Sequence, residues 1–134
     1  MEDLVLYKVR ISVLWIIAIL VEVINLLLSV MDPAVLKEMI ETGAVGGVKI
    51  TPEETLLGEI IILIMVVMPF LSVTLNGKAN RWSNIIVAAA FLVLWIAELI
   101  MAPGNAVKIL GLIADMVFFV LIIWYAYSWP KKKE

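Results

Sequence analysis

Residues 105–129 read NAVKILGLIADMVFFVLIIWYAYSW, and this stretch decides the fold class. It is long enough to cross the hydrocarbon core of a bilayer, about 30 Å thick, as a single helix. Asp115 is its only acidic side chain. A carboxylate deep in a membrane-spanning helix costs about 2.5–3.5 kcal/mol on insertion scales, so it usually faces protein or water and usually has a function.

Three further runs share this design. The chain of 134 residues is 64% hydrophobic with a mean hydropathy of +1.12, whereas soluble domains are about half apolar. We therefore predict an all-α integral membrane protein, a four-helix transmembrane bundle that forms a single domain over residues 1–134. The predicted spans cover about residues 7–31, 53–75, 80–101 and 105–129, and away from its ends each span contains one acid: Glu22, Glu59, Glu98 or Asp115.

A short amphipathic helix is predicted in the first, outer loop. Asp32 suits an N-cap, Pro33 suits the first helical position, and Gly43 favours a stop. Between them, apolar residues alternate with Lys and Glu in a helical pattern, and about ten residues are too few to span a bilayer. We expect a helix over residues 33–42 on the membrane surface or folded over the bundle. The alternative is a solvated loop with a helical turn.

The distribution of basic residues predicts the orientation. Seven of the ten Lys and Arg residues lie on the side of the two termini and the second loop. The positive-inside rule places that side in the cytoplasm. We therefore expect a multi-pass cell-membrane protein with cytoplasmic N- and C-termini, and the acidic start of the chain predicts no removable signal peptide. The seven residues are Lys8, Arg10, Lys78, Arg81, Lys131, Lys132 and Lys133.

The composition excludes several function classes. The chain has no cysteine and no histidine, which excludes disulfides, thiol nucleophiles, His-ligated haem, the common zinc sites and Ser-His catalysis. A net charge of −2 gives no basic field for nucleic acid. We therefore expect no cofactor and no enzymatic activity, and a lipid-modifying enzyme is the least favoured alternative.

The four acids are predicted to lie at similar depths. At 1.5 Å per residue they are roughly 6–14 Å below the outer boundary of the membrane. Each lies on a stripe of polar, small and aromatic residues spaced by three and four positions, which is one helix face. Because polar groups avoid lipid, the stripes are predicted to face one another. In the second span the stripe is Thr55, Glu59, Ile62, Val66, Pro69, Val73 and Asn76.

No Lys or Arg lies in the interior of a span to neutralise these acids. Clustered carboxylates in a low dielectric cannot all ionise, so some must hold protons or share a cation. The hypothesis is an outward-opening acidic pocket for protons, a small cation or a protonated amine, and the pattern leaves open whether a metal ion binds. The predicted ligands are Glu22, Asn25, Glu59, Glu98 and Asp115, and the predicted lining residues are Trp15, Ser29, Trp95 and Gly111.

Two other interpretations of the acids stay open. Protonated acids and amides can act as interhelical hydrogen-bond glue worth about 1 kcal/mol each, and the acids can form a surface for a partner. The first hypothesis is thus a small cation- or proton-coupled transporter or binding protein, homo-oligomeric in the lipid bilayer. The alternative is a non-catalytic accessory or scaffold subunit.

Three segments of the chain form a recognisable set: NRWSNII at residues 80–86, SVLW at 12–15 and WYAYSWP at 124–130. Together they resemble an uncharacterised family of small prokaryotic four-span membrane proteins, a domain of unknown function. The resemblance implies four spans with a basic N-R-W turn, and it matches Asp115 to the family's acid nine residues before W-Y-A. The chain departs from the family pattern at Asn25, where the family has an acid, and carries Glu22 one turn earlier. The resemblance implies no activity, substrate or partner.

Overall fold

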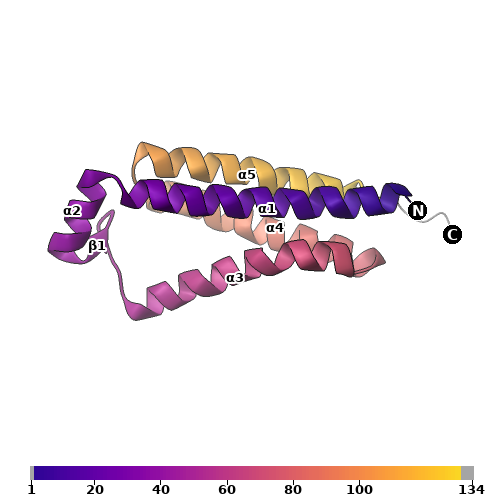
Figure 1. Ribbon diagram of the computed structural model, residues 1–134, viewed down its shortest axis with the longest axis horizontal. Coiled ribbons are helices and arrows are strands. Elements are labelled where there is room, and N and C mark those ends of the chain that lie inside the picture. Colours follow the sequence, from indigo (N-terminus) through magenta and orange to yellow (C-terminus); the bar gives the residue numbers. More distant parts are fainter. Residues whose placement is uncertain (1, 131–134) are drawn as a thin grey trace.

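The computed structural model describes residues 2–130, and within them the protein is almost entirely helical (Figure 1). The predicted all-α class is confirmed. The basic tail Lys131–Lys133, which contributes to the predicted orientation, lies outside the described residues. The elements are α1 (Glu2–Val30), α2 (Pro33–Thr42), β1 (Ala44–Val45), β2 (Val48–Lys49), α3 (Pro52–Thr74), α4 (Gly77–Met101) and α5 (Ala106–Tyr127).

Four helices, α1, α3, α4 and α5, are long and apolar enough to cross a membrane. Their outward surfaces carry large exposed apolar side chains, whereas Asn25, Ser72, Asn80, Asn84 and Asp115 are buried. Apolar groups outside and polar groups inside are the arrangement that a lipid environment favours. The fold is thus compatible with a multi-pass membrane protein.

The helices pack unevenly. α5 contacts both α1 and α4 extensively, α3 packs mainly on α1, and α3 has few contacts with α4. Figure 1 shows α3 approaching the other helices near the chain termini and diverging from them toward α2 and β1. We call the end that holds α2, β1 and β2 the hairpin end, and the opposite end the termini end. The bundle is therefore open between α3 and α4 at the hairpin end.

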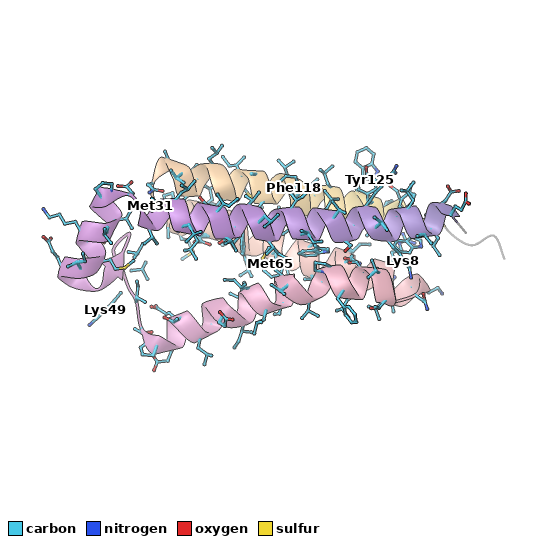
Figure 2. The ribbon with its side chains drawn as sticks, viewed as in Figure 1. Lys8, Met31, Lys49, Met65, Phe118 and Tyr125 are labelled. Carbon is cyan, nitrogen blue, oxygen red and sulfur yellow. The ribbon has the colours of Figure 1, made fainter. Side chains whose placement is uncertain are left out.

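The buried face of α3 differs from the predicted stripe. The predicted stripe residues Val66 and Val73 are exposed, and the buried residues of α3 are Met65, Met68 and Ser72. Met65 lies between α3 and α1 (Figure 2). The predicted stripe passes through Glu59, but α3 packs only over its second half. There the position of Met65 and Met68 determines which face of α3 is buried. In α1 and α4 the predicted polar and small stripes hold most of the buried residues. In α5 the predicted stripe holds half of them, Gly111, Asp115 and Ile122, and the others are Leu112, Phe119 and Ala126.

Local signals explain the connection at the hairpin end. Asp32 caps α2 by accepting a hydrogen bond from the backbone N–H of Ala34 at 2.9 Å, and Gly43 ends α2 in the left-handed conformation with φ of 68°. A two-stranded antiparallel hairpin of β1 and β2 follows. Its turn glycines both have positive φ, and their N–H groups donate to the Glu38 carboxylate at 3.0 and 2.7 Å. The capping residues and this carboxylate thus hold α2 and the hairpin together.

α3 begins with a capping box. The Thr51 hydroxyl accepts a hydrogen bond from the Glu54 N–H, and the Glu54 carboxylate accepts one from the Thr51 N–H. Two orphan N–H groups of the helix start are thereby satisfied. At the other end of α3, Lys8 of α1 donates to Asn76 Oδ1 at 2.9 Å, and Lys8 is labelled at the termini end in Figure 2. The capping box thus stabilises the start of α3, and the Lys8 contact ties the region after its end to α1.

Candidate functional site

Two carboxyl groups meet inside the molecule. Asp115 of α5 is fully buried, and its Oδ2 accepts a long hydrogen bond of 3.4 Å from Nε1 of Trp95 in α4. Glu22 of α1 is partly buried, and its carboxyl group lies near enough to that of Asp115 for each to influence the ionisation of the other. The two acids therefore form a pair between α1 and α5.

The pair is short of hydrogen-bond donors. Glu22 Oε2 and Asp115 Oδ1 are buried, and neither accepts a hydrogen bond from any described residue. An acceptor left unsatisfied in a protein interior costs about 1–3 kcal/mol. Two ionised carboxylates also repel each other, and a hydrogen bond between them requires one proton. Such a pair is stabilised when one group holds a proton or when a cation lies between the two.

Asn25 continues the polar face of α1 one turn toward the hairpin end. It is 7% exposed, its Nδ2 donates weakly to the backbone carbonyl of Lys108 at 3.5 Å, and its Oδ1 has no partner among residues 2–130. Gly111 of α5, which has no side chain, leaves room for the Asn25 amide. A Cβ at Gly111 would lie 2.3 Å from Cγ and Nδ2 of Asn25, so any larger residue would displace the amide.

A cleft of about 880 Å³ lies at the hairpin end, beyond Asn25 along α1. Ser29 of α1 lines it, and the buried Ser29 Oγ has no partner within the described chain. Glu98 and Lys108 line the opposite wall and form an ion pair of 2.8 Å, while Lys108 Nζ also donates to the carbonyl of Ala102 at 2.9 Å. From Ser29 to Glu22 is about 10 Å along the helix axis. Unpartnered polar atoms therefore lead from the cleft to the carboxyl pair.

The corner of the cleft is fixed by Asp32, a half-buried acid outside the spans. Asp32 Oδ2 accepts a hydrogen bond of 3.1 Å from Nδ2 of Asn105, which itself caps α5 through the N–H of Lys108. The backbone N–H of Ala34 and then this amide stabilise the carboxylate and hold the pKa of Asp32 below its ordinary value. Asp32 thus ties the end of α1 to the start of α5.

The polar groups at the termini end are arranged differently. Nε1 of Trp15 donates to Asn84 Oδ1 at 2.7 Å, and Ser72 Oγ lies 2.9 Å from the same oxygen. The Asn84 amide donates to the backbone and side-chain oxygens of Asn80, and the Asn80 amide donates to the carbonyls of Ser72 and Leu75. This network links α1, α3 and α4 and is saturated.

An aromatic layer separates the two polar regions. Trp15, Phe91, Trp95 and Phe119 contact one another with ring centroids 5.4–6.1 Å apart. Phe119 is fully buried and Trp15 is too. The packed rings therefore close the carboxyl pair toward the termini end.

The structure brings most of the predicted site residues together, in two groups. The first group is the Glu22–Asp115 pair with its neighbours Asn25, Trp95 and Gly111. Ser29 and Glu98 line the cleft above it. Trp15 belongs to the aromatic layer and to the saturated network.

Glu59 is not placed with the other acids. It is exposed on α3, does not line the cleft, and has no hydrogen bond or ion pair within residues 2–130. The reason is the divergence of α3, whose half nearest the hairpin end packs little against the other helices (Figure 1). Glu59 therefore belongs to a surface rather than to the carboxyl pair.

The sequence analysis missed the Glu98–Lys108 ion pair and the Asn80–Asn84–Ser72 network. Lys108 lies two turns before Asp115 on one face of α5, so its spacing could have indicated a role near the acids. Asn80 and Asn84 are four residues apart, which also favours contact on a helix. Nothing in the sequence indicates that Ser72 of α3 meets them.

Comparison of the chain with protein-family models, with curated proteins and with solved structures finds no match. The interpretation of the site therefore rests on the geometry described above.

Proposed function

We propose that this chain is a four-span membrane protein whose Glu22–Asp115 pair takes up and releases a proton or a small cation, as a coupled transporter or a binding protein. One observation carries the proposal. Two carboxyl groups are neighbours in the interior, each with a buried oxygen that accepts no hydrogen bond from the described residues. Intramembrane acids of this kind commonly mark ion or proton pathways.

The distribution of unpaired atoms argues against hydrogen-bond glue. Five buried side-chain atoms are unpaired in the described chain, and four of them belong to Glu22, Asn25, Ser29 and Asp115. The fifth is Nε of Arg81. Glue would saturate its groups, as Asn80 and Asn84 do at the termini end. The unpaired set lies on one path and favours an exchangeable guest, such as water, a proton or a cation.

The donor set favours a small guest. Within the described residues, no three or more Asp or Glu side chains are grouped so that they could hold a metal ion. A calcium site takes six to eight oxygen ligands, whereas this site offers two carboxyl groups and the Asn25 amide oxygen. A proton needs only the two carboxyl groups. We therefore favour proton exchange, with another cation entering from the cleft.

The proposed orientation places the hairpin end outside the cell. Among the described residues, four basic side chains belong to the termini end and three to the hairpin end, and the sequence adds three lysines after the last span. The positive-inside rule assigns the more basic side to the cytoplasm. The cleft then opens outward, and α2, with exposed Leu36 and Ile40, lies at the outer membrane surface. The protein thus belongs to the cell membrane in this proposal, with both termini cytoplasmic.

A flux assay in proteoliposomes tests the proposal. Liposomes containing the full chain and an internal pH dye are given outward or inward gradients of Na⁺, K⁺ or an organic ammonium ion. We expect proton movement coupled to at least one gradient, abolished by Asp115→Asn. Glu59→Gln is the matched control, because it removes a carboxylate from a span without touching the pair. Coupled movement that survives Asp115→Asn would remove the pair from the mechanism.

A second candidate function rests on Glu59. Glu59 is exposed about two turns into the apolar helix α3. An ionised acid facing lipid is costly, and the side of α3 that carries it has no cover within the described chain. A partner protein or a second copy of this chain would cover it, as in an accessory subunit or a homo-oligomer. Crosslinking from position 59 distinguishes the two, since only the homo-oligomer gives a product of twice the chain mass from purified protein.

A further inference from the structure

The cleft at the hairpin end is larger than proton exchange requires. Its volume of about 880 Å³ lies within the roughly 300–1,000 Å³ that is typical of sites for small organic ligands. Elements from across the chain form it: the end of α1, α2, both strands, the start of α3 and the connection between α4 and α5. The divergence of α3 from α4 creates this space (Figure 1).

The walls of the cleft are largely apolar. The contributing side chains come from four different elements and include no aromatic ring. They are Leu26, Val35, Val45, Val48 and Ile50. Walls of this kind favour a ligand with a hydrocarbon body over a bare, strongly hydrated ion.

The charges in the cleft are predominantly negative. Four acids line it, Asp32, Glu38, Glu54 and Glu98, against the single base Lys108, which gives a formal charge of −3. Lys108 is engaged by Glu98 at 2.8 Å. A concave site lined by one sign of charge concentrates ligands of the opposite sign.

Within residues 2–130 the other three acids form no ion pair with a basic side chain. Their hydrogen bonds come from backbone N–H groups and from the Asn105 amide, all of them uncharged donors. These bonds fix the carboxylates in position without neutralising them. A cationic group in the cleft would therefore meet preorganised negative charge.

We propose that the cleft binds a lipophilic organic cation, such as a protonated or quaternary amine with an apolar body. The inference rests on the proposed function in one respect, because it names the class of cation that would exchange against the proton of the Glu22–Asp115 pair. Ser29 and Asn25, with unpaired Oγ and Oδ1 atoms, connect the cleft to that pair. Binding in the cleft itself requires only the walls and the charges.

Equilibrium binding of tetraphenylphosphonium to the full chain in lipid nanodiscs tests the inference. Tetraphenylborate, a near-identical shape with the opposite charge, is the ligand control, and empty nanodiscs give the lipid background. We expect saturable binding of the phosphonium and none of the borate above background. Equal binding of both ions, or no saturable binding of the phosphonium, would overturn the inference.

A pair of adjacent variants locates the binding site. Glu54→Gln removes one cleft charge yet keeps a side chain that can complete the capping box of α3. Glu53→Gln is the matched control, since Glu53 is exposed and lies outside the cleft. We expect phosphonium binding to weaken about two- to fivefold in Glu54→Gln, the range of a partly exposed charge pair, and to stay unchanged in Glu53→Gln. Equal effects of the two variants would overturn the assignment to the cleft.

Asp115→Asn separates this inference from the proposed function. The variant should retain phosphonium binding within about twofold, because Asp115 does not line the cleft, while losing coupled proton movement. If phosphonium binds and no proton movement is found in the unsubstituted chain, the proposed function fails and the cleft site stands. If protons move and phosphonium does not bind, the inference fails alone.

Discussion

At the scale of single residues, function is indicated by the acceptors that stay unpaired. Asp115 is fully buried, and its Oδ1 has no hydrogen-bond partner in the described chain. Asn25 is also buried, and its Oδ1 likewise has no partner there. Asn84 is equally buried, yet its side-chain oxygen and nitrogen all have partners. The same physics of costly burial thus produces packing at one end of the molecule and an open site at the other.

Gly111 offers a residue-scale prediction. Gly111→Ala places a Cβ 2.3 Å from the end of the Asn25 side chain, so Asn25 must rotate away from the Lys108 carbonyl. Overpacking of this kind costs about 1–3 kcal/mol in free energy of unfolding. Gly58→Ala is the control, because nothing lies within 4 Å of its added Cβ. It should stabilise α3 by about 0.4–1 kcal/mol. Unfolding in detergent measures both, and equal stabilisation by the two changes would contradict the contact.

At the scale of helices, periodicity along the sequence predicts the buried face of some helices and not of others. The predicted stripes of α1 and α4 hold most of the buried residues of those helices, because a polar and small face avoids lipid. The stripe of α5 holds half of its buried residues, because large apolar side chains such as Phe119 share the interior. The predicted buried face of α3 is wrong, because the face that packs depends on the angle between helices. A single-helix pattern holds no information on that angle. Where α3 diverges, Glu59 meets no partner helix, and Met65, Met68 and Ser72 decide the face over the packed half.

The packed half of α3 gives an element-scale prediction. Met68 is 2% exposed, whereas the neighbouring Val67 is 47% exposed. Met68→Ala should lower the free energy of unfolding by about 2–5 kcal/mol, the range for a buried large-to-small change. Val67→Ala should change it by less than about 0.5 kcal/mol. Comparable losses in the two variants would mean that α3 packs on another face.

The corner between α1, α2 and α5 gives a prediction of pH dependence. The folded protein holds the pKa of Asp32 below its reference of 3.8 through Ala34 and Asn105. A lowered pKa contributes stability that is fully present above pH 3.8 and is lost as the pH falls through the lowered value. Asn105→Ala should move the pKa of Asp32 back toward 3.8. Carboxyl-carbon NMR titration measures it, and an unchanged pKa in Asn105→Ala would contradict the Asn105 contact.

At the scale of the whole molecule, the site depends on an opening that no sequence pattern announced. Hydropathy predicted four spans and their approximate ends, because length and apolarity are properties of each segment. The missing closure between α3 and α4 is a property of the assembled helices. It turns the predicted single pocket into two parts, an inner carboxyl pair and an outer cleft.

The proposed orientation can be measured directly, because the chain has no cysteine. Lys49→Cys at the hairpin end and Lys78→Cys at the termini end change exposed residues. A membrane-impermeant maleimide applied to intact cells should label only position 49. Both positions should react after the membrane is opened. Labelling of position 78 alone in intact cells would reverse the orientation and place the cleft in the cytoplasm.

The most direct test of the central claim is an infrared measurement of protonated carboxyl groups. Full-length protein in lipid at neutral pH, without added organic cation, should show a carboxylic-acid C=O band. Under the proposal that the pair shares a single proton, this band should shift in frequency or disappear in both Glu22→Gln and Asp115→Asn, and it should persist unchanged in Glu59→Gln. A spectrum without such a band, or a band that stays unchanged in either pair variant, would contradict a proton held between Glu22 and Asp115.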